Sequence, residues 1–305
     1  MQTSEPPRPA LPATESISPR LRDLDRWPAA QVLLALWEGQ LAAVAAVRAA
    51  LPAIESAAEA ALPRLARGGR LVYAGAGTSG RIGVQDGAEL PPTFDWPEDR
   101  LVLLMAGGDA AFTRSIENAE DDRAAALRDV ATHNIGAGDV AIGIAASGST
   151  PYTTTIISEC AQRGALTIGI ANSPRGALLA AAAHPILVET GAEAIAGSTR
   201  LQAGTAQKVV LNLFSTLLMV RMGRVHRGLM VDMNARNTKL RARAVRMLQD
   251  LTGADDAAAR AALDEAGGRV KTAVLVLRGL DRATAESLLE KHAGHLHAAL
   301  AGIGA

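Results

Sequence analysis

The chain alternates short apolar runs with longer segments in which apolar residues recur at helical spacing. Five such runs lie between residues 70 and 189, each followed by a segment long enough for a helix. Strands separated by helices are typical of βαβ units, so we predict an α/β fold: a parallel sheet flanked by helices on both faces. The predicted strands are residues 70–74, 101–106, 140–145, 166–171 and 185–189.

Helical patterns flank this alternation on both sides. Residues 27–67 are rich in Ala, Leu and Val at helical spacing, and Pro52 and Pro63 predict breaks between two or three helices. A long buried helix is expected over residues 198–222. Beyond residue 237 the helical segments become charged and no strand pattern remains. The C-terminal helical candidates are residues 240–251, 255–266 and 283–300.

These patterns divide the chain into three parts. Residues 1–20 are rich in Pro, Ser and Glu, which predicts a flexible arm. Residues 21–239 form the α/β domain with its N-terminal helices. Residues 240–305 form a small helical C-terminal module.

Composition excludes several classes of protein. Hydrophobic residues make up 49% of the 305 residues and charged residues 20%, enough for a substantial core. Lys+Arg and Asp+Glu both number 31, so the chain lacks the basic excess of a nucleic-acid-binding protein. The single Cys160 excludes an internal disulfide framework and a multi-cysteine metal site. The six histidines show no metal-ligand spacing near the loops described below, so no metal is expected.

The sequence also predicts where in the cell the protein is located. The N-terminus lacks a basic patch followed by an apolar core, so it does not read as a signal peptide. The longest apolar segment, residues 209–220, is shorter than the about 20 residues that a bilayer requires. We therefore expect a cytoplasmic protein without a membrane partner.

Two strand-to-loop transitions look alike and carry the candidate chemistry. The loops after the first and third predicted strands combine glycines with hydroxyl side chains. Ligands of open α/β sheets bind outside the carboxyl ends of the strands, so both loops should face one crevice. Hydroxyls and backbone N–H groups at a helix N-terminus suit a phosphate monoester. The candidates are Thr78, Ser79 and Gly80 in the first loop and Ser147, Ser149 and Thr150 in the second.

Three other interpretations of these loops stay open. The hydroxyl residues could simply cap helices. Gly75, Gly77 and Gly80 match the dinucleotide fingerprint G-x-G-x-x-G, although the next strand ends later than that motif expects. A P-loop fits less well, because Arg81 and Ile82 replace the Lys and Ser/Thr that grip phosphate and magnesium.

Acidic residues supply the candidate acid and base. Glu89 lies between apolar residues and two prolines, shortly after the first loop. Glu117 and Glu120 are spaced i, i+3, which would place them on one helical face. Asp121 and Asp122 are expected at the surface or as caps.

Taken together, these segments resemble the N-acetylmuramic acid 6-phosphate etherases, a branch of the sugar isomerase (SIS) domain family. The likeness runs from Thr14 and Glu15 through the C-terminal helices, although Gly87, Ala88 and Ser149 depart from the usual family pattern. The matching segments are residues 74–83 (AGAGTSGRIG), 89–93 (ELPPT), 117–122 (ENAEDD), 143–152 (GIAASGSTPY), 197–211 (GSTRLQAGTAQKVVL) and 228–240 (GLMVDMNARNTKL).

The resemblance implies a fold and a reaction. The fold is an SIS domain over residues 21–239. The reaction cleaves the D-lactyl ether of N-acetylmuramic acid 6-phosphate, in peptidoglycan amino-sugar recycling, and gives N-acetylglucosamine 6-phosphate and D-lactate. No cofactor is implied. The partners implied are the sugar phosphate substrate and a second copy of the chain, since SIS modules usually pair.

The resemblance also assigns residues. Glu89 matches the glutamate that donates a proton to the departing lactate, and Glu120 the second essential glutamate, plausible as the base at C2; the two roles could be exchanged. Lys208 and Glu117 are further candidates at the substrate, beside the hydroxyl residues that hold the phosphate. The alternatives within the family are a sugar-phosphate-binding regulator and a sugar-phosphate isomerase.

Overall fold

The computed structural model describes residues 12–233, 235 and 238–303. The chain divides into two compact units, which are described one at a time. Of the described residues, the first contains 12–86 together with 101–214, and the second contains 87–100 together with those from 215 onward. The second unit thus holds the helices expected beyond residue 240 but also other segments, and a separate module starting at residue 240 stays a prediction.

The first unit is built on a five-stranded parallel sheet with the order β2-β1-β3-β4-β5. This confirms the predicted α/β fold, with strand boundaries within two residues of expectation. β1 pairs with both β2 and β3, so that Gly75 lies opposite Met105 on one side and Ile144 on the other. The strands are β1 (Leu71–Gly75), β2 (Leu101–Met105), β3 (Val140–Ala145), β4 (Leu166–Ala171) and β5 (His184–Leu187).

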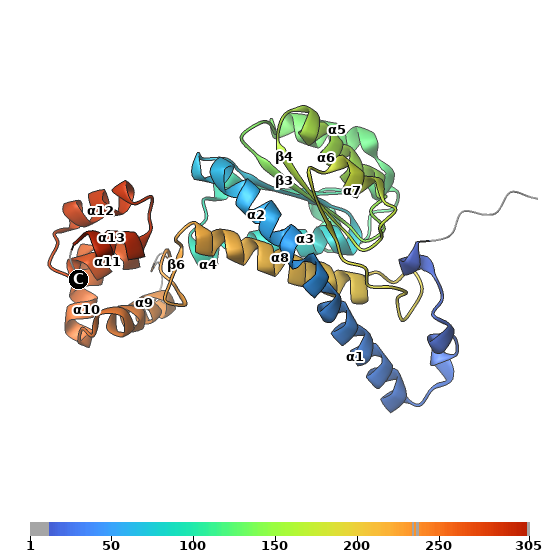
Figure 1. Cartoon of the computed structure of the whole chain (residues 1–305), viewed down its shortest axis with the longest axis horizontal. Coiled ribbons are helices and arrows are strands. Elements are labelled where there is room, and N and C mark those ends of the chain that lie inside the picture. The colour runs from blue at the N-terminus through green and yellow to red at the C-terminus, as the bar shows by residue number, and fades with distance from the viewer. Residues whose placement is uncertain (1–11, 234, 236–237, 304–305) are drawn as a thin grey trace, which may run out of the picture. The chain divides into compact units, whose positions relative to one another are not determined.

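Helices cover both faces of this sheet. Every residue of β1, β3 and β4 is buried, which explains why these strands read as continuous apolar runs. Figure 1 shows α5, α6 and α7 on one face and α2, α3 and α8 on the other. Their bounds are α1 (Ala29–Ala46), α2 (Leu51–Ala66), α3 (Gly77–Ala88), α5 (Arg123–Thr132), α6 (Pro151–Gln162), α7 (Ala177–Ala181) and α8 (Gln202–Arg221).

Cys160 lies in the core between α6 and the sheet. It is fully buried in one apolar cluster with side chains of β1, β2, β3, α5 and α6. Burial raises the pKa of its thiol to about 12. The residue therefore packs as a small apolar group.

The N-terminal helices differ from expectation at one proline. Pro52 lies in the first turn of α2, where its missing N–H costs no hydrogen bond, and a 3₁₀ turn (Val47–Ala50) separates α2 from α1. Pro63 does not end the helix but lies inside α2, three residues before its last residue. The segment therefore forms two helices.

Two helical stretches are long and apolar enough to cross a membrane by length and composition, residues 29–66 and 202–221. This is weak evidence, since core helices of soluble proteins pass the same test and 56% of the window in α8 is buried. On α1, by contrast, Leu33, Trp37 and Leu41 form a stripe at i, i+4 spacing, and each is at least half exposed.

An ion pair closes the amino end of the sheet. Arg70 precedes β1 and Asp139 precedes β3; the guanidinium donates to both carboxylate oxygens, at 2.9 Å and 2.7 Å. Burial alone would raise the pKa of the Asp139 carboxyl, but hydrogen bonds from Arg70 and from the Gly136 N–H outweigh it and lower that pKa.

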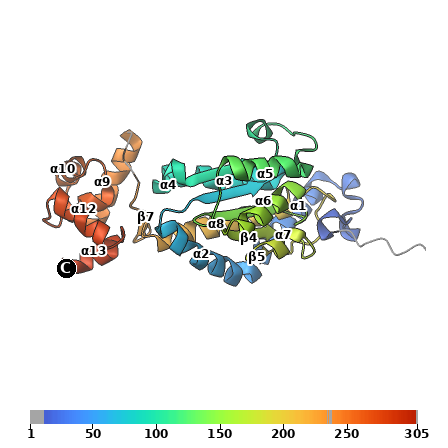
Figure 2. The ribbon, with the colours of Figure 1, turned by 90° about the horizontal axis from the view of Figure 1, so that it is seen from above.

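The second unit is mostly helical. Its core gathers apolar side chains of α9 to α13 with those of β7 (Leu229–Met230), which pairs with β6 (Val225–His226) in a two-stranded hairpin. Figure 2 shows α9, α10, α12 and α13 side by side. The helix expected over 283–300 is divided, because Ala293 and Gly294 adopt positive φ angles. The helices are α4 (Leu90–Phe94), α9 (Thr238–Thr252), α10 (Asp256–Glu265), α11 (Val270–Val276), α12 (Arg282–Lys291) and α13 (Leu296–Gly302).

Candidate functional site

The strand order places a crevice between β1 and β3. The chain leaves β1 toward β2 on one side and leaves β3 toward β4 on the other, so the loops after these neighbouring strands diverge. In open α/β sheets such a reversal of strand order is the usual place for a ligand. A cavity of about 380 Å³ lies here. It is lined by Glu15, Ala76, Gly77, Thr78, Ser79, Glu120, Asp121, Ala146, Ser147, Ser149, Thr150, Pro151, Gly197 and Thr199.

The structure brings together the two hydroxyl loops that the sequence singled out. Thr78 and Ser79 lie in the first turn of α3, and Thr150 immediately precedes α6. Both helices are twelve residues long, so their N-terminal N–H groups and dipoles favour an anion in the cavity. The first turn of each helix thereby contributes to one site.

The capping interpretation does not account for these hydroxyls. The Thr150 side chain makes no capping hydrogen bond to α6. Within the described residues, the hydroxyls of Thr78 and Ser79 have no hydrogen-bond partner, although Ser79 is only 8% exposed. Ser147 is engaged, since its Oγ accepts a hydrogen bond from the Ser149 N–H at 3.1 Å. Several hydroxyls therefore stay available to a ligand.

Gly80 contributes in another way than a ligand contact. It does not line the cavity, and a Cβ at this position would lie 2.7 Å from the Gly75 carbonyl group and 2.4 Å from the Met105 sulfur. Only glycine allows α3 to approach β1 this closely. The close approach is what points the first turn of α3 at the cavity.

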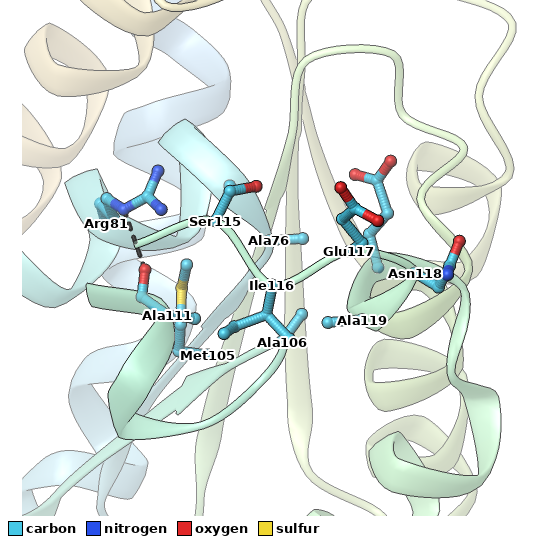
Figure 3. A pocket seen from close by; sticks show the side chains of 12 residues that line it. Ala76, Arg81, Met105, Ala106, Ala111, Ser115, Ile116, Glu117, Asn118 and Ala119 are labelled. Atoms are coloured by element: carbon cyan, nitrogen blue, oxygen red, sulfur yellow. Dashed lines mark hydrogen bonds between the residues drawn. The ribbon is translucent and has the colours of Figure 1, made fainter. Parts of the chain in front are cut away.

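A smaller cavity of about 180 Å³ adjoins the first (Figure 3). Ala76, Gly77 and Glu120 line both cavities, so the two are neighbours. Figure 3 shows Glu117 and Asn118 on one side and Arg81 on the other. The residues that line it are Ala76, Gly77, Arg81, Met105, Ala106, Ala111, Ser115, Ile116, Glu117, Asn118, Ala119 and Glu120.

The loop that carries Glu117 and Glu120 departs from the expected helix. Asn118 has a left-handed backbone, and only a short 3₁₀ turn (Ala119–Asp121) follows it. Asp122 caps α5 by accepting the Ala125 N–H at 2.8 Å, one of the roles expected for it. The irregular backbone lets Glu117 reach the smaller cavity while Glu120 reaches both.

Arg81 holds this loop from α3. Its Nε donates to the Ala111 carbonyl at 3.0 Å and its Nη2 donates to the Arg114 carbonyl at 3.1 Å. Figure 3 shows the bond to Ala111. Arg81, which stands where a P-loop has Lys, thus ties the loop that carries Glu117 and Glu120 to α3.

The charged side chains that line the larger cavity are all acidic. Its charged lining side chains are Glu15, Glu120 and Asp121, and no Lys or Arg lines it within the part of the chain that the structure describes. An anion there must be held by N–H groups, hydroxyls and helix dipoles rather than by ion pairs. The described residues also contain no group of three or more His, Cys, Asp or Glu side chains that could hold a metal ion.

Lys208 and Glu89 line neither cavity among the described residues. The Nζ of Lys208 lies 3.9 Å from Oδ1 of Asp86, whose Oδ2 accepts a hydrogen bond from the buried Tyr73 hydroxyl at 3.1 Å. Burial, and then the Asp86 charge, raise the pKa of Tyr73. Glu89 is exposed, precedes α4 and belongs to the second unit. The roles given to both residues stay predictions.

Sequence reasoning missed several lining residues. Glu15 comes from the segment predicted to be a flexible arm, and Asp121 was expected at the surface. Gly197 and Thr199 precede α8 and lie in the matching segment 197–211, but no ligand contact was predicted for them. Their signal was present in the matching segments, yet a linear pattern does not show that these distant segments converge at one edge of the sheet.

Comparison with known proteins points to one family. Two family models match: the glucokinase regulatory protein N-terminal SIS domain over residues 53–161, and the SIS domain over residues 119–217. The chain is 53% identical over 283 residues to an N-acetylmuramic acid 6-phosphate etherase of Deinococcus radiodurans, covering 92% of this chain and 93% of the relative. It is 48% identical to the etherase of Streptomyces avermitilis, covering 94% and 93%.

A solved structure agrees on the fold. A protein from Bacteroides fragilis described as a phosphosugar isomerase involved in capsule formation is 19% identical, with a TM-score of 0.50. The likeness covers 66% of this chain and 99% of that protein. It shows an SIS-type fold.

Proposed function

Because the chain belongs to the N-acetylmuramic acid 6-phosphate etherases, we propose that the paired cavities between β1 and β3 are where it cleaves its substrate. The chain is a carbon–oxygen lyase of this family. It converts N-acetylmuramic acid 6-phosphate and water to N-acetylglucosamine 6-phosphate and D-lactate. The observation that carries the assignment of the site is one cavity that combines two hydroxyl-bearing helix N-termini with Glu120.

The reaction is an elimination followed by an addition. In the open-chain sugar, C2 is α to the C1 aldehyde and the lactyl ether at C3 is β to it. A base removes the C2 proton, the C3–O bond breaks, and an acid protonates the departing lactate oxygen. Water then adds at C3 of the unsaturated aldehyde while C2 regains a proton. Two acid/base groups suffice for this sequence.

The residues take roles within this scheme. Glu120, which lines both cavities, is the proposed base at C2. Glu89 is proposed as the acid for lactate on the family resemblance alone. The phosphate, remote from the reacting bonds, binds at Thr78, Ser79, Ser147, Ser149 and Thr150. Its binding energy orients C2 and C3 against the carboxylate. The smaller cavity beside Glu117 and Glu120 offers space for the lactyl group.

The assembly and location are part of the proposal. The exposed stripe of Leu33, Trp37 and Leu41 on α1 is an apolar surface of the kind that proteins bury on association. A homodimer would cover this stripe, and we place the protein in the cytoplasm. Sedimentation of the wild type and of Trp37→Glu tests this: a dimer that the substitution dissociates is expected, and a wild-type monomer would contradict it.

Lactate release from N-acetylmuramic acid 6-phosphate tests the reaction and the acid together. Wild type, Glu89→Gln and the matched control Glu98→Gln, another exposed glutamate of the same segment, are assayed side by side. We expect lactate from wild type and control, and a kcat lower by about 10²-fold or more in Glu89→Gln. Near-normal turnover of Glu89→Gln would remove that residue from its role.

The wild type also decides between the enzyme and its alternatives. If folded wild type binds N-acetylglucosamine 6-phosphate but releases no lactate, the chain is a sugar-phosphate sensor or isomerase instead. Binding is measured by titration calorimetry in the same buffer.

A further inference from the structure

Glu15 is the contribution of the N-terminal segment to the larger cavity. Every other lining residue of this cavity in the described chain follows β1 in the sequence. Glu15 ends a short 3₁₀ turn (Ala13–Glu15). Ser16 closes this turn, because its N–H and its hydroxyl both donate to the Ala13 carbonyl, at 3.1 Å and 2.6 Å.

The segment is fixed to the wall of the cavity. The Gly197 N–H donates to the Thr14 carbonyl at 2.9 Å, and the Thr14 side chain is completely buried. A Cβ at Gly197 would lie 3.0 Å from Oε2 of Glu15, so the carboxylate rests against this glycine. Gly197 has a φ of +76° and lines the cavity itself. The position of Glu15 is therefore determined by contacts, although the side chain is exposed to solvent.

Among the residues that the structure describes, the Glu15 carboxylate has no protein partner. Within the described residues it makes no hydrogen bond or ion pair, and no cationic side chain lines the cavity with it. A phosphate dianion next to it would be repelled. An ionised carboxylate only accepts hydrogen bonds, so it requires neutral or cationic donors. The phosphosugar offers such donors in its hydroxyl groups and its acetamido N–H.

We propose that Glu15 is a substrate-binding residue that accepts hydrogen bonds from the hydroxyl or acetamido N–H groups of the sugar. It acts together with the hydroxyl loops: the helix N-termini attract the phosphate, and Glu15 repels it and attracts the neutral part of the substrate. The two effects fix the direction in which the sugar lies in the cavity. This role rests on the proposed function of the site.

Two ligands measured on the same variants test the proposal. Titration calorimetry gives the Kd of N-acetylglucosamine 6-phosphate and of inorganic phosphate for wild type, Glu15→Ala and Glu15→Gln. Asp25→Asn is the matched control, an exposed carboxylate of the same N-terminal segment that lines neither cavity. Lactate assays of each variant give kcat and KM.

The proposal expects opposite effects on the two ligands. Glu15→Ala should weaken binding of the sugar phosphate by about 10- to 100-fold, the scale of hydrogen bonds to a charged group. Binding of inorganic phosphate should stay equal or become tighter, because a negative charge is removed. Glu15→Gln, which retains one acceptor oxygen, should fall between, and Asp25→Asn should match wild type.

Other results would overturn the role. An equal loss of both ligands in Glu15→Ala would mean that the residue only supports the fold of the segment. Unchanged affinity for both would mean that the carboxylate does not contact the sugar. A failure of the proposed function has a different signature: folded wild type would bind no sugar phosphate, and Glu15 would lose its role with it.

Discussion

Charged and polar side chains lie at both ends of the five-stranded sheet, but the carboxylates that line the cavity differ from the carboxylate at the amino end in how they are paired. At the amino end, Arg70 donates to Asp139 and to the carbonyls of His133 and Asn134, and Asp139 also accepts the Gly136 N–H. At the carboxyl end, by contrast, the carboxylates and several hydroxyls that line the cavity have no side-chain partner among the residues that the structure describes.

This difference in pairing suggests that the amino end contributes to the stability of the fold and the carboxyl end to ligand binding. Buried polar groups in a folded chain are normally hydrogen-bonded, since an unmet group costs free energy. Within the described residues, Thr78, Ser79, Glu15 and Glu120 make no side-chain hydrogen bond to the protein. Asp139 at the amino end is buried and hydrogen-bonded, whereas at the carboxyl end Glu15 and Glu120 are exposed and only Ser79 is buried, so these polar groups are open to a ligand. Substitutions at the two ends should therefore differ in kind.

The largest expected effect is at the carboxyl end. Glu120→Gln should lower kcat by about 10²- to 10⁴-fold, because it removes a group that exchanges protons with the substrate. The Kd for N-acetylglucosamine 6-phosphate should change by only a few fold. Glu117→Gln is the matched comparison, since Glu117 lines only the smaller cavity whereas Glu120 lines both. Lactate assays and calorimetry measure both, and equal losses of kcat would break the distinction between the two glutamates.

At the amino end the expected effect is on folding. Asp139→Ala should lower the free energy of unfolding by about 3–5 kcal/mol, because it leaves the Arg70 guanidinium without its carboxylate. Urea denaturation measures the loss, and kcat of the folded fraction should match wild type. Asp256→Ala, which breaks an exposed pair with Arg260, is the control and should leave the urea midpoint near wild type. A fall in kcat for Asp139→Ala would show that the two ends are coupled.

Arg81 gives an intermediate case, because it acts on the site through hydrogen bonds. Arg81→Ala should lower kcat by about 10- to 100-fold, since small misplacement of a catalytic group has effects of this size. The Kd for inorganic phosphate should stay unchanged. Arg81→Lys should recover part of the activity, and Arg114→Ala, an exposed arginine of the same loop, is the control. If Arg81 only stabilised the fold, Arg81→Ala would instead lower the urea midpoint and weaken the binding of all ligands equally.

The smallest effect concerns pH. The pKa of Asp139 is lower in the folded than in the unfolded chain, so its contribution to stability is complete above the unfolded value of about 4. That contribution is lost as the pH falls below this value and through the folded pKa. Urea midpoints measured between pH 6 and pH 3 should fall less steeply in Asp139→Asn than in wild type. Parallel curves would contradict the assignment.

The sequence predicted the strands well for a physical reason. Strands covered on both faces read as unbroken apolar runs, as in β3 and β4, whose every residue is buried. The hydroxyl loops were also predictable, because parallel strands place the loops that follow them at one edge. Family resemblance supplied the roles of the glutamates, which no local pattern could supply.

The features that escaped prediction depend on contacts between distant segments. Glu15 reaches the cavity because the Thr14 carbonyl accepts a hydrogen bond from the Gly197 N–H. The positive φ of Asn118 redirects the loop that carries Glu120, where spacing alone favoured a helix. Pro63 is accommodated inside α2, although local preference indicates a break.

Because Cys160 is buried, the rate at which its thiol is modified can report local opening of the core. The only thiol of the chain is enclosed between α6 and the sheet and is almost entirely protonated at neutral pH. A thiol reagent can therefore react only when this part of the core opens. The rate of modification reports how often α6 parts from the sheet, and a ligand that binds at the N-terminus of α6 should slow it.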